Sequence, residues 1–203
     1  ETPVSYNART LYDRDRRLQG VFAAVRDITE RKQAEQQILN LASHDALTHL
    51  PNRRLFNDRL DFTMANGKRS RRYSALMFLD LDNFKTVNDL HGHNVGDLLL
   101  IETAQRISSC LRAVDTVARF GGDEFAVILR GKLDEDTLRQ YGERVISVFE
   151  PAYTEAGQQV NVTCSAGIAT FPDDAPDMDA LVSNADTAMY RAKELGKNRC
   201  VRF

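Results

Sequence analysis

Two short stretches of the sequence combine acidic side chains with the pattern of a buried strand. In RFGGDEFAVIL, residues 119–129, two glycines and two carboxylates precede an apolar run. In FLDLD, residues 78–82, Asp80 and Asp82 end a second apolar run. Because alternate residues of a strand share a face, these two acids lie on one side of it. Neighbouring carboxylates repel, and burying them is costly. We therefore expect a bound cation, since Lys85 alone compensates weakly.

The sequence around Gly121 and Gly122 also favours a bound cation. Glycine adopts backbone conformations closed to other residues and lets a ligand approach closely. Asp123 and Glu124 add oxygen atoms of the kind that hard divalent cations bind. Asp80 and Asp123, from neighbouring strands, would then bind one Mg²⁺ ion. Because Mg²⁺ usually takes one or two carboxylates plus substrate phosphates, the pattern indicates a nucleoside triphosphate site and phosphoryl or nucleotidyl transfer. The alternative is a plain glycine turn with solvated acids.

The elements around these stretches alternate between helix and strand. From residue 44 onward, hydrophobic periodicity and capping residues predict eight elements. They are helix 52–66, strand 73–81, helix 94–112, strand 115–120, strand 125–130, helix 134–150, strand 159–171 and helix 178–195. The two strands that flank the glycines have to pair as a hairpin, so part of the sheet is antiparallel. The sequence therefore predicts an α+β fold, with helices packed on one sheet.

The first 43 residues form a separate pattern. Residues 4–12 and 20–28 are rich in β-branched and aromatic residues and predict two strands joined by a charged turn. Residues 29–43 predict a helix, which Asp27 or Thr29 can cap. Its apolar stripe consists of Ala34, Ile38 and Leu41. Such a stripe needs a partner helix.

Composition excludes several classes of protein. The chain has 203 residues, of which 42% are hydrophobic and 28% charged, enough for one good core. A formal net charge of −2 gives no basic field for a phosphate backbone, so we expect no nucleic-acid partner. No apolar run approaches the roughly 18 residues of a membrane span, so we expect no membrane contact here, although a longer parent can be anchored upstream. Three widely spaced cysteines fit reduced thiols and a cytoplasmic location.

Four motifs resemble, in order and spacing, those of the GGDEF-domain diguanylate cyclases. They are DALTHLPNRR (45–54), FLDLDNFKTVNDLHGHNVGD (78–97), RFGGDEF (119–125) and ADTAMYRAKELGKNR (185–199). The resemblance covers residues 44–203 and implies a ferredoxin-like core with a central, mostly antiparallel, palm-like sheet related to nucleotidyl cyclases and polymerases. It implies that two GTP molecules are joined into cyclic di-GMP and pyrophosphate, with Mg²⁺ or Mn²⁺. Residues 1–28 resemble the last strands of a PAS sensor domain, and residues 29–43 its signalling helix.

The resemblance assigns catalytic roles to residues of the two acidic stretches. Asp80 and Asp123 look like the metal-binding acids, assisted by the Leu81 carbonyl. Glu124 looks like the remaining acid, which helps with the metal or with activation of the attacking 3′-hydroxyl. The turn at Gly121 and Gly122 looks like the one that aligns the α-phosphate. The reaction that the resemblance implies needs no side-chain nucleophile.

Other residues match positions that hold the substrate. Asn88 and Asp97 match the positions that read guanine, whose mixed donor and acceptor edge an amide and a carboxylate can satisfy. Lys193 and Lys197 match phosphate-contacting cations, and Lys85 is expected to help order the phosphate loop. Lysines four apart at a helix end are routinely solvated, so without the motif the pair would have no assigned role.

The resemblance also implies a dimer and a regulatory site. The product is two-fold symmetric and each domain holds one GTP, so two chains have to face each other. RAVD, residues 112–115, has the spacing of the family's product-inhibition motif ahead of the glycines. Arg112, Asp115 and the more distant Arg144 would bind cyclic di-GMP. The alternative is an exposed Arg–Asp pair worth under about 1 kcal/mol.

One position departs from the family pattern. His49 stands where the family usually has glycine in D-x-L-T-G-L, and we expect a tolerated loop change. Asp45, Asn52 and Arg53 are expected to hold the start of the domain together without touching substrate. Two functions stay open: an active cyclase, and a non-catalytic module that binds GTP or cyclic di-GMP and relays a signal.

Overall fold

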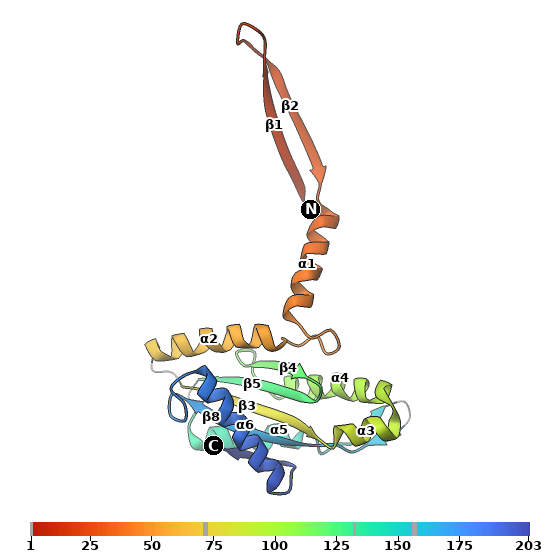
Figure 1. The fold of residues 1–203 in the computed structure, drawn as a ribbon, viewed down its shortest axis with the longest axis vertical. Coiled ribbons are helices and arrows are strands. Elements are labelled where there is room, and N and C mark those ends of the chain that lie inside the picture. The colour runs from red at the N-terminus through yellow and green to blue at the C-terminus, as the bar shows by residue number, and fades with distance from the viewer. Residues whose placement is uncertain (1, 71–72, 132, 156–157) are drawn as a thin grey trace. The chain divides into compact units, whose positions relative to one another are not determined.

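The chain divides into two compact units, Glu1–Ala42 and Ser43–Phe203. A computed structural model (Figure 1) describes residues 2–70, 73–131, 133–155 and 158–203. The second unit has the predicted α+β fold, built on a five-stranded sheet that is mostly antiparallel. None of the helices in the described ranges is both long and apolar enough to cross a membrane.

The first unit is a β-hairpin followed by a helix. β1 (Val4–Tyr12) pairs antiparallel with β2 (Leu18–Asp27), and α1 spans Thr29–Ser43. These elements lie where the sequence predicts them, with the second strand two residues longer at its start. The backbone N–H and the hydroxyl of Thr29 donate to Asp27 Oδ1 at 2.8 and 2.6 Å, so Asp27 caps the helix.

The two faces of this hairpin differ in polarity. Antiparallel partners point to the same side, which places Val4, Tyr6, Val21 and Val25 on one face. Each of these four side chains is more than half exposed. A two-stranded hairpin with a bare apolar face is marginal by itself. For Ile38 and Leu41 of the expected stripe, the structure describes the backbone of α1 but not the side chains, so the stripe stays a prediction.

The central sheet of the second unit has its strands in the order β4-β5-β3-β8-β9. Neighbours pair antiparallel, except for β8 and β9, which run parallel. The strands are β4 (Thr116–Gly121), β5 (Glu124–Gly131), β3 (Tyr73–Asp82), β8 (Thr163–Phe171) and β9 (Arg199–Arg202). β3 is therefore central, and its carboxyl end lies beside the β4–β5 turn.

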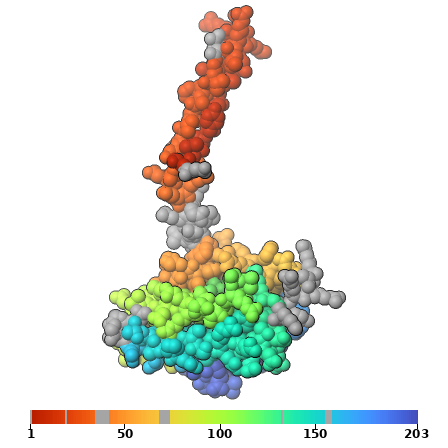
Figure 2. Space-filling model, turned by 180° about the vertical axis from the view of Figure 1, so that it is seen from behind, coloured from red at the N-terminus to blue at the C-terminus, as the bar shows by residue number. Residues whose placement is uncertain are grey.

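Helices cover both faces of this sheet (Figure 1). One face packs against α2 (Arg53–Ser70) and α6 (Met178–Glu194). The other packs against α4 (His93–Ser109) and α5 (Glu135–Ser147). Figure 2 views the molecule from this second side, with α4 in light green and α5 in turquoise.

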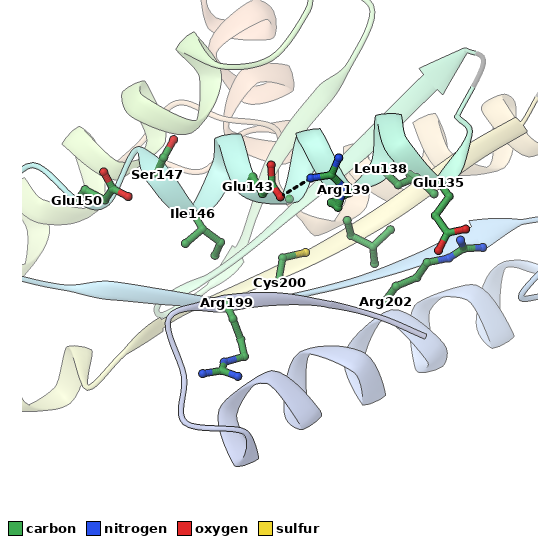
Figure 3. Close-up of a pocket in the computed structure, with 12 residues that line it drawn as sticks. Glu135, Leu138, Arg139, Glu143, Ile146, Ser147, Glu150, Arg199, Cys200 and Arg202 are labelled. Carbon is green, nitrogen blue, oxygen red and sulfur yellow. Dashed lines mark hydrogen bonds and ion pairs between the residues drawn. The ribbon is translucent and has the colours of Figure 1, made fainter.

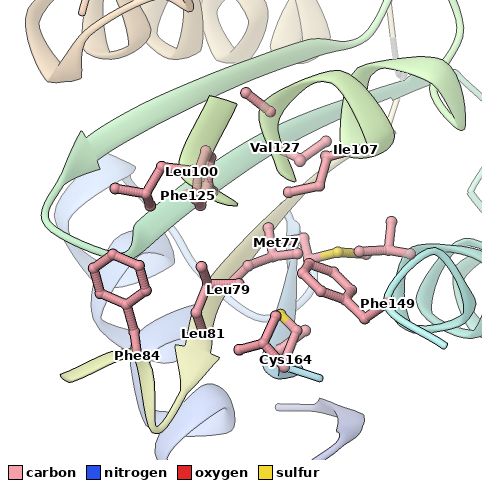
Figure 4. Close-up of a cluster of buried hydrophobic side chains, with 14 of the residues drawn as sticks. Met77, Leu79, Leu81, Phe84, Leu100, Ile107, Phe125, Val127, Phe149 and Cys164 are labelled. Atoms are coloured by element: carbon pink, nitrogen blue, oxygen red, sulfur yellow. The ribbon is translucent and has the colours of Figure 1, made fainter. Parts of the chain in front are cut away.

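Strand alternation divides the apolar side chains between two cores. Met77 and Leu79 of β3 lie with Phe125 and Val127 of β5 in the core under α4 and α5 (Figure 4). Even-numbered residues of β3, such as Leu76 and Phe78, lie in the core under α2 and α6. Asp80 has the same parity, so its side chain lies on the α6 side of the sheet.

Several short elements differ from the sequence prediction. Helix α3 (Phe84–His91) was not predicted, because only Phe84 and Val87 of its eight residues are buried, too few for a clear period. The short strand β9 was also missed. The strand expected at 159–171 is two elements, since β7 (Gln158–Val160) pairs with β6 (Tyr153–Glu155) and β8 begins later. The other boundaries agree to within four residues.

The three cysteines are free thiols. Burial raises the pKa of Cys200 to about 12 and that of the fully buried Cys164 well above its usual value. Desolvation also raises the pKa of the half-buried Cys110. Because the thiolate is the reactive form, a raised pKa lowers the reactivity of these thiols near neutral pH.

Close packing at Gly167 of β8 sets the position of α6, and alanine there should destabilise the second unit. A Cβ at Gly167 would lie 2.1 Å from the Met189 nitrogen and 2.2 Å from the Ala185 carbonyl oxygen. Both are backbone atoms of α6, so the helix itself would have to move. We expect Gly167→Ala to lower the free energy of unfolding by about 1–3 kcal/mol or more in urea denaturation. Gly20→Ala, whose Cβ would meet no atom within 4 Å, is the control, and equal effects would contradict the prediction.

Candidate active site

The carboxyl end of β3 and the β4–β5 turn bring the predicted acids together. Asp80 pairs with Glu124 across β3 and β5, and the Leu81 N–H donates to the Asp123 carbonyl oxygen at 3.3 Å. The turn itself needs glycine, because Gly121 has φ 141° and Gly122 has φ 53°. Asp80, Asp123 and Glu124 therefore lie around one end of the sheet.

Helix α6 places a cation against the most enclosed of these acids. Lys193 Nζ lies 2.8 Å from Asp80 Oδ1, and the two side chains are 31% and 14% exposed. This contact follows from strand parity, because Asp80 faces the side of the sheet that α6 covers. The last turn of α6, in which Lys193 lies, thus reaches the end of β3.

The site carries more negative than positive charge. Burial raises the pKa of Asp80; Lys193 opposes this rise, while Asp123 and Asp82 add to it. Burial also raises the pKa of Glu124, and the neighbouring Asp80, Asp123 and Asp186 raise it further. One lysine is thus set against several carboxylates. An added cation would relieve their repulsion.

Asp186 was missed by sequence reasoning, although the sequence contains a signal for it. It is an exposed residue of α6, and its charge acts on Glu124. Residues seven apart lie on the same face of a helix, so Asp186 shares a face with Lys193. A search of the fourth motif for polar residues at that spacing would have found it.

Asp82 has a structural role, in contrast to Asp80. Its carboxylate accepts hydrogen bonds from the hydroxyls of Thr163 and Ser165, both at 2.7 Å, and from the Asn198 N–H at 3.1 Å. It is only 4% exposed. Asp82 therefore needs no cation, because β8 and the segment after α6 already supply its partners.

Arg119 holds the glycine turn in place and was also missed. Its guanidinium donates to the Gly122 carbonyl oxygen from Nε at 3.0 Å and from Nη2 at 2.7 Å. It also contacts Asp45 Oδ1 from Nη1 at 2.9 Å. Asp45 in turn accepts from the Thr48 N–H at 2.8 Å, and these hydrogen bonds lower the pKa of Asp45 against the effect of burial. The expected holding role of Asp45 is thus seen, with Arg119 as its partner.

The loop before α2 explains the other two residues expected to hold the start of the domain. Asn52 Oδ1 accepts from the Leu55 N–H at 3.1 Å, as a helix cap does. The Arg53 guanidinium lies 5.5 Å from the centre of the Phe120 ring. His49 has φ 58°, a left-handed conformation in which glycine is less strained. Histidine at this position therefore carries a small conformational cost, and its tolerance stays a prediction.

The predicted guanine-reading residues lie on two consecutive helices that pack together. Asn88 is in α3, and Asp97 is an exposed residue of α4. Asn88 Oδ1 is buried and has no hydrogen-bond partner in the described structure. Lys85, also on α3, is exposed. Lys197 Nζ donates to Asn83 Oδ1 at 2.7 Å, so it lies at the junction between β3 and α3.

The three residues of the predicted regulatory site meet around Tyr141 of α5. The guanidinium groups of Arg112 and Arg144 lie 5.6 and 5.1 Å from the centre of its ring. The Tyr141 hydroxyl donates to Asp115 Oδ2 at 3.2 Å, and the Arg112 N–H donates to the same oxygen at 3.0 Å. Arg112 and Arg144, 32 residues apart in sequence, thus lie at the same ring. The sequence pattern predicted a helix at Tyr141 but gave no sign of this role.

A concave region lies elsewhere on this unit. A groove of about 650 Å³ runs between α5 and the edge of the sheet at β8 and β9 (Figure 3). Ile146 and Cys200 contribute apolar surface, and Arg139 forms an ion pair with Glu143 at 2.8 Å. None of the residues predicted for the active or regulatory site lines it. It is separate from the acids of β3.

Within the described ranges, no three His, Cys, Asp or Glu side chains are grouped so that they could hold a metal ion. An all-protein metal cage is therefore not formed there. Mg²⁺ does not require one, because it is commonly held by one or two carboxylates together with substrate phosphates.

Comparison with known proteins identifies the class of domain. The profile of the family described as "Diguanylate cyclase, GGDEF domain" matches residues 42–199. The chain belongs to this family, which confirms the resemblance seen in the four motifs. The match does not extend over the hairpin β1–β2.

Curated relatives share this similarity over part of their length. The chain is 42% identical over 170 residues to the bifunctional diguanylate cyclase/cyclic di-GMP phosphodiesterase MucR of Pseudomonas aeruginosa, covering 84% of the chain and 25% of MucR. It is 40% identical over 178 residues to the diguanylate cyclase TpbB of the same organism, covering 85% of the chain and 41% of TpbB. The chain thus spans less than half of either relative.

Solved structures show the same fold. The GGDEF domain of TpbB from Pseudomonas aeruginosa superposes with a TM-score of 0.76 at 37% identity, covering 78% of the chain and 93% of that structure. The coiled coil and GGDEF domain of DgcB from Caulobacter crescentus, in complex with cyclic di-GMP, gives 0.75 at 27% identity, covering 87% and 93%. These likenesses confirm the α+β fold with its mostly antiparallel sheet.

Replacing Glu124 by glutamine should raise thermal stability near neutral pH but not in acid. Because the pKa of Glu124 is raised in the folded state, this state holds the proton more tightly than the unfolded state. Stability is therefore lost as the pH rises from the ordinary glutamate pKa, about 4.3, through the raised value. Glutamine removes that loss.

Thermal melts of Glu124→Gln and the parent protein, near neutrality and below the ordinary glutamate pKa, test this expectation. Glu150→Gln, which neutralises an exposed acid outside the cluster, is the matched control. A gain that is the same at both pH values, or the same in the control, would show that charge crowding is not the cause.

Proposed function

We propose that residues 44–203 form an active diguanylate cyclase, which joins two GTP molecules into cyclic di-GMP and releases pyrophosphate. The observation that carries the proposal is the convergence of Asp80, Asp123 and Glu124 at the end of β3, beside Lys193 from α6. Membership of the family and the curated activity of relatives such as TpbB support it.

The donor set fits a divalent metal ion. Asp80 and Asp123 offer hard oxygen ligands, and the raised pKa of Asp80 reflects a carboxylate that is buried and short of positive charge. Asp80, Asp123 and the Leu81 carbonyl are the groups that would hold Mg²⁺ or Mn²⁺. When bound, the ion supplies neutralisation of the triphosphate and a lower pKa for the attacking 3′-hydroxyl.

The side chains of the chain supply the remaining parts of the reaction. Glu124 would help with the metal or accept a proton from the 3′-hydroxyl. For the second role, its raised pKa makes it a better base near neutrality than an ordinary glutamate. Lys193 and Lys197 neutralise phosphate charge, Lys85 helps order the phosphate loop, and the turn held by Arg119 aligns the α-phosphate. Asn88 and Asp97 read the guanine.

Each chain holds one GTP, so the two-fold symmetric product requires a homodimer with facing sites. Helix α1 would bias this encounter. GTP and reduced thiols are both available in the cytoplasm, where we place the domain.

We further propose that residues 1–28 are the end of a PAS domain and residues 29–43 a signalling helix. The exposed apolar side chains of the hairpin support this assignment, because such a surface resembles part of a larger sheet.

Incubation with GTP and Mg²⁺, followed by chromatographic separation of products, tests the proposed activity. We expect cyclic di-GMP, and turnover per chain that falls on dilution. Asp80→Asn and Asp123→Asn should each reduce turnover by at least about 100-fold, since each removes charge stabilisation at the reacting phosphate. Asp173→Asn, an exposed acid after the far end of β8, should retain it. GTP bound without turnover would favour the non-catalytic module.

Cyclic di-GMP should inhibit the domain by binding at Arg112, Asp115 and Arg144. Their convergence around Tyr141 supports this part of the proposal. In calorimetry, Arg112→Ala should weaken cyclic di-GMP binding about 10- to 100-fold, the range expected when charge-assisted hydrogen bonds are lost.

The control for this experiment is Arg139→Ala, which removes an exposed arginine paired with Glu143 outside the cluster. It should bind cyclic di-GMP as the parent does. Undiminished binding by Arg112→Ala would refute the regulatory site while leaving the cyclase proposal intact.

A further inference from the structure

The side-chain amide of Asn88 has no partner within the described protein. Its Oδ1 is buried and accepts no hydrogen bond, whereas its Nδ2 is not a buried atom without a partner. The backbone carbonyl of the same residue is engaged, since it accepts from the Gly92 N–H at 2.9 Å. Leaving a buried polar atom without a partner lowers the stability of the fold by about 1–3 kcal/mol. The orientation of the Asn88 amide therefore has to be explained by a neighbouring residue.

Gly96 in the first turn of α4 is that residue. A Cβ on Gly96 would lie 1.9 Å from Asn88 Oδ1 and 3.0 Å from Asn88 Cγ. The amide therefore occupies the space that any other residue at position 96 would fill with its own side chain. Asn88 Oδ1 therefore lies against Gly96, and Nδ2 is the end of the amide that is left for a ligand.

The backbone does not explain a glycine at position 96. Gly96 has no left-handed φ and lies within α4, where glycine is less favourable than alanine by about 0.5–1 kcal/mol. The nearest atoms that a methyl group would meet belong to the flexible end of the Asn88 side chain, followed by the Phe84 ring at 3.3 Å. Alanine is thus compatible with the fold if the amide moves.

We propose that Gly96 determines base specificity, by seating the Asn88 amide so that its Nδ2 donor faces the purine. The inference rests on the proposed function, in which GTP is the substrate. Guanine presents an acceptor, O6, at the position where adenine presents an amino donor. A donor held in one orientation therefore pairs with guanine and opposes adenine. Gly96 is a positioning residue in this scheme and does not itself touch the base.

The substitution Gly96→Ala separates this role from folding. We expect the variant to melt at or above the temperature of the parent, because α4 gains a better helix former while only the amide is displaced. In calorimetry with Mg²⁺ and the non-hydrolysable α,β-methylene analogues of GTP and ATP, the preference for the guanine analogue should fall about 3- to 10-fold. This is the range of one lost hydrogen bond. The adenine analogue should bind no more weakly than before, because the displaced amide donor no longer opposes its amino group.

Three further variants make the test specific. Asn88→Ala should lose the same preference, and Gly96→Ala combined with Asn88→Ala should lose no more than either alone, because both remove one interaction. Asn94→Ala, an exposed residue of the same helix, should retain the preference.

Three results would overturn the inference. A folded Gly96→Ala that keeps the full preference would show that the glycine does not position the amide. A variant that melts well below the parent would show that more than the amide has to move. A parent protein without preference for the guanine analogue would refute the proposed function and the inference with it, whereas a failure confined to Gly96→Ala leaves the proposed function standing.

Discussion

The crowding of carboxylates at the carboxyl end of β3, balanced by one lysine from α6, is the constraint on which the site depends. Asp80 is buried enough for its pKa to rise even though Lys193 lies 2.8 Å away. Burial, followed by three neighbouring acids, raises the pKa of Glu124. Such an arrangement opposes folding, because like charges are held together in a partly desolvated place. Crowded, partly buried acids with shifted pKa values are typical of functional sites.

The surrounding structure holds these charges in place with neutral and charged hydrogen bonds. Asp82, two residues from Asp80, is satisfied by hydroxyl and backbone donors and anchors β3 to β8. Arg119 ties the glycine turn to Asp45, so the turn is held from the loop before α2. Close packing at Gly167 fixes α6, and with it Lys193. The acids are therefore supported by three separate parts of the second unit.

Secondary structure was predictable where an element is long and has one apolar face. The strands at β3, β5 and β8 and the helices at α2, α4, α5 and α6 were found, because each buries enough side chains to produce a period. Helix α3 and strand β9 were missed for the opposite reason: each is short, and its place is set by contacts with other elements. The candidate site was predictable in its residue types, while Arg119, Asp186 and Tyr141 were not recognised.

The sequence alone determined the chemistry that the domain offers: acids at a strand end, glycines at a turn, and four motifs whose family membership the comparisons confirm. These are local properties, written in residue type and spacing. Only the tertiary structure decided which residues meet. It paired Lys193 with Asp80, gathered Arg112 and Arg144 around Tyr141, and placed Asn88 against Gly96. The physical reason is that strand parity, helix crossing and close packing join residues far apart in the chain, and no local pattern contains that information.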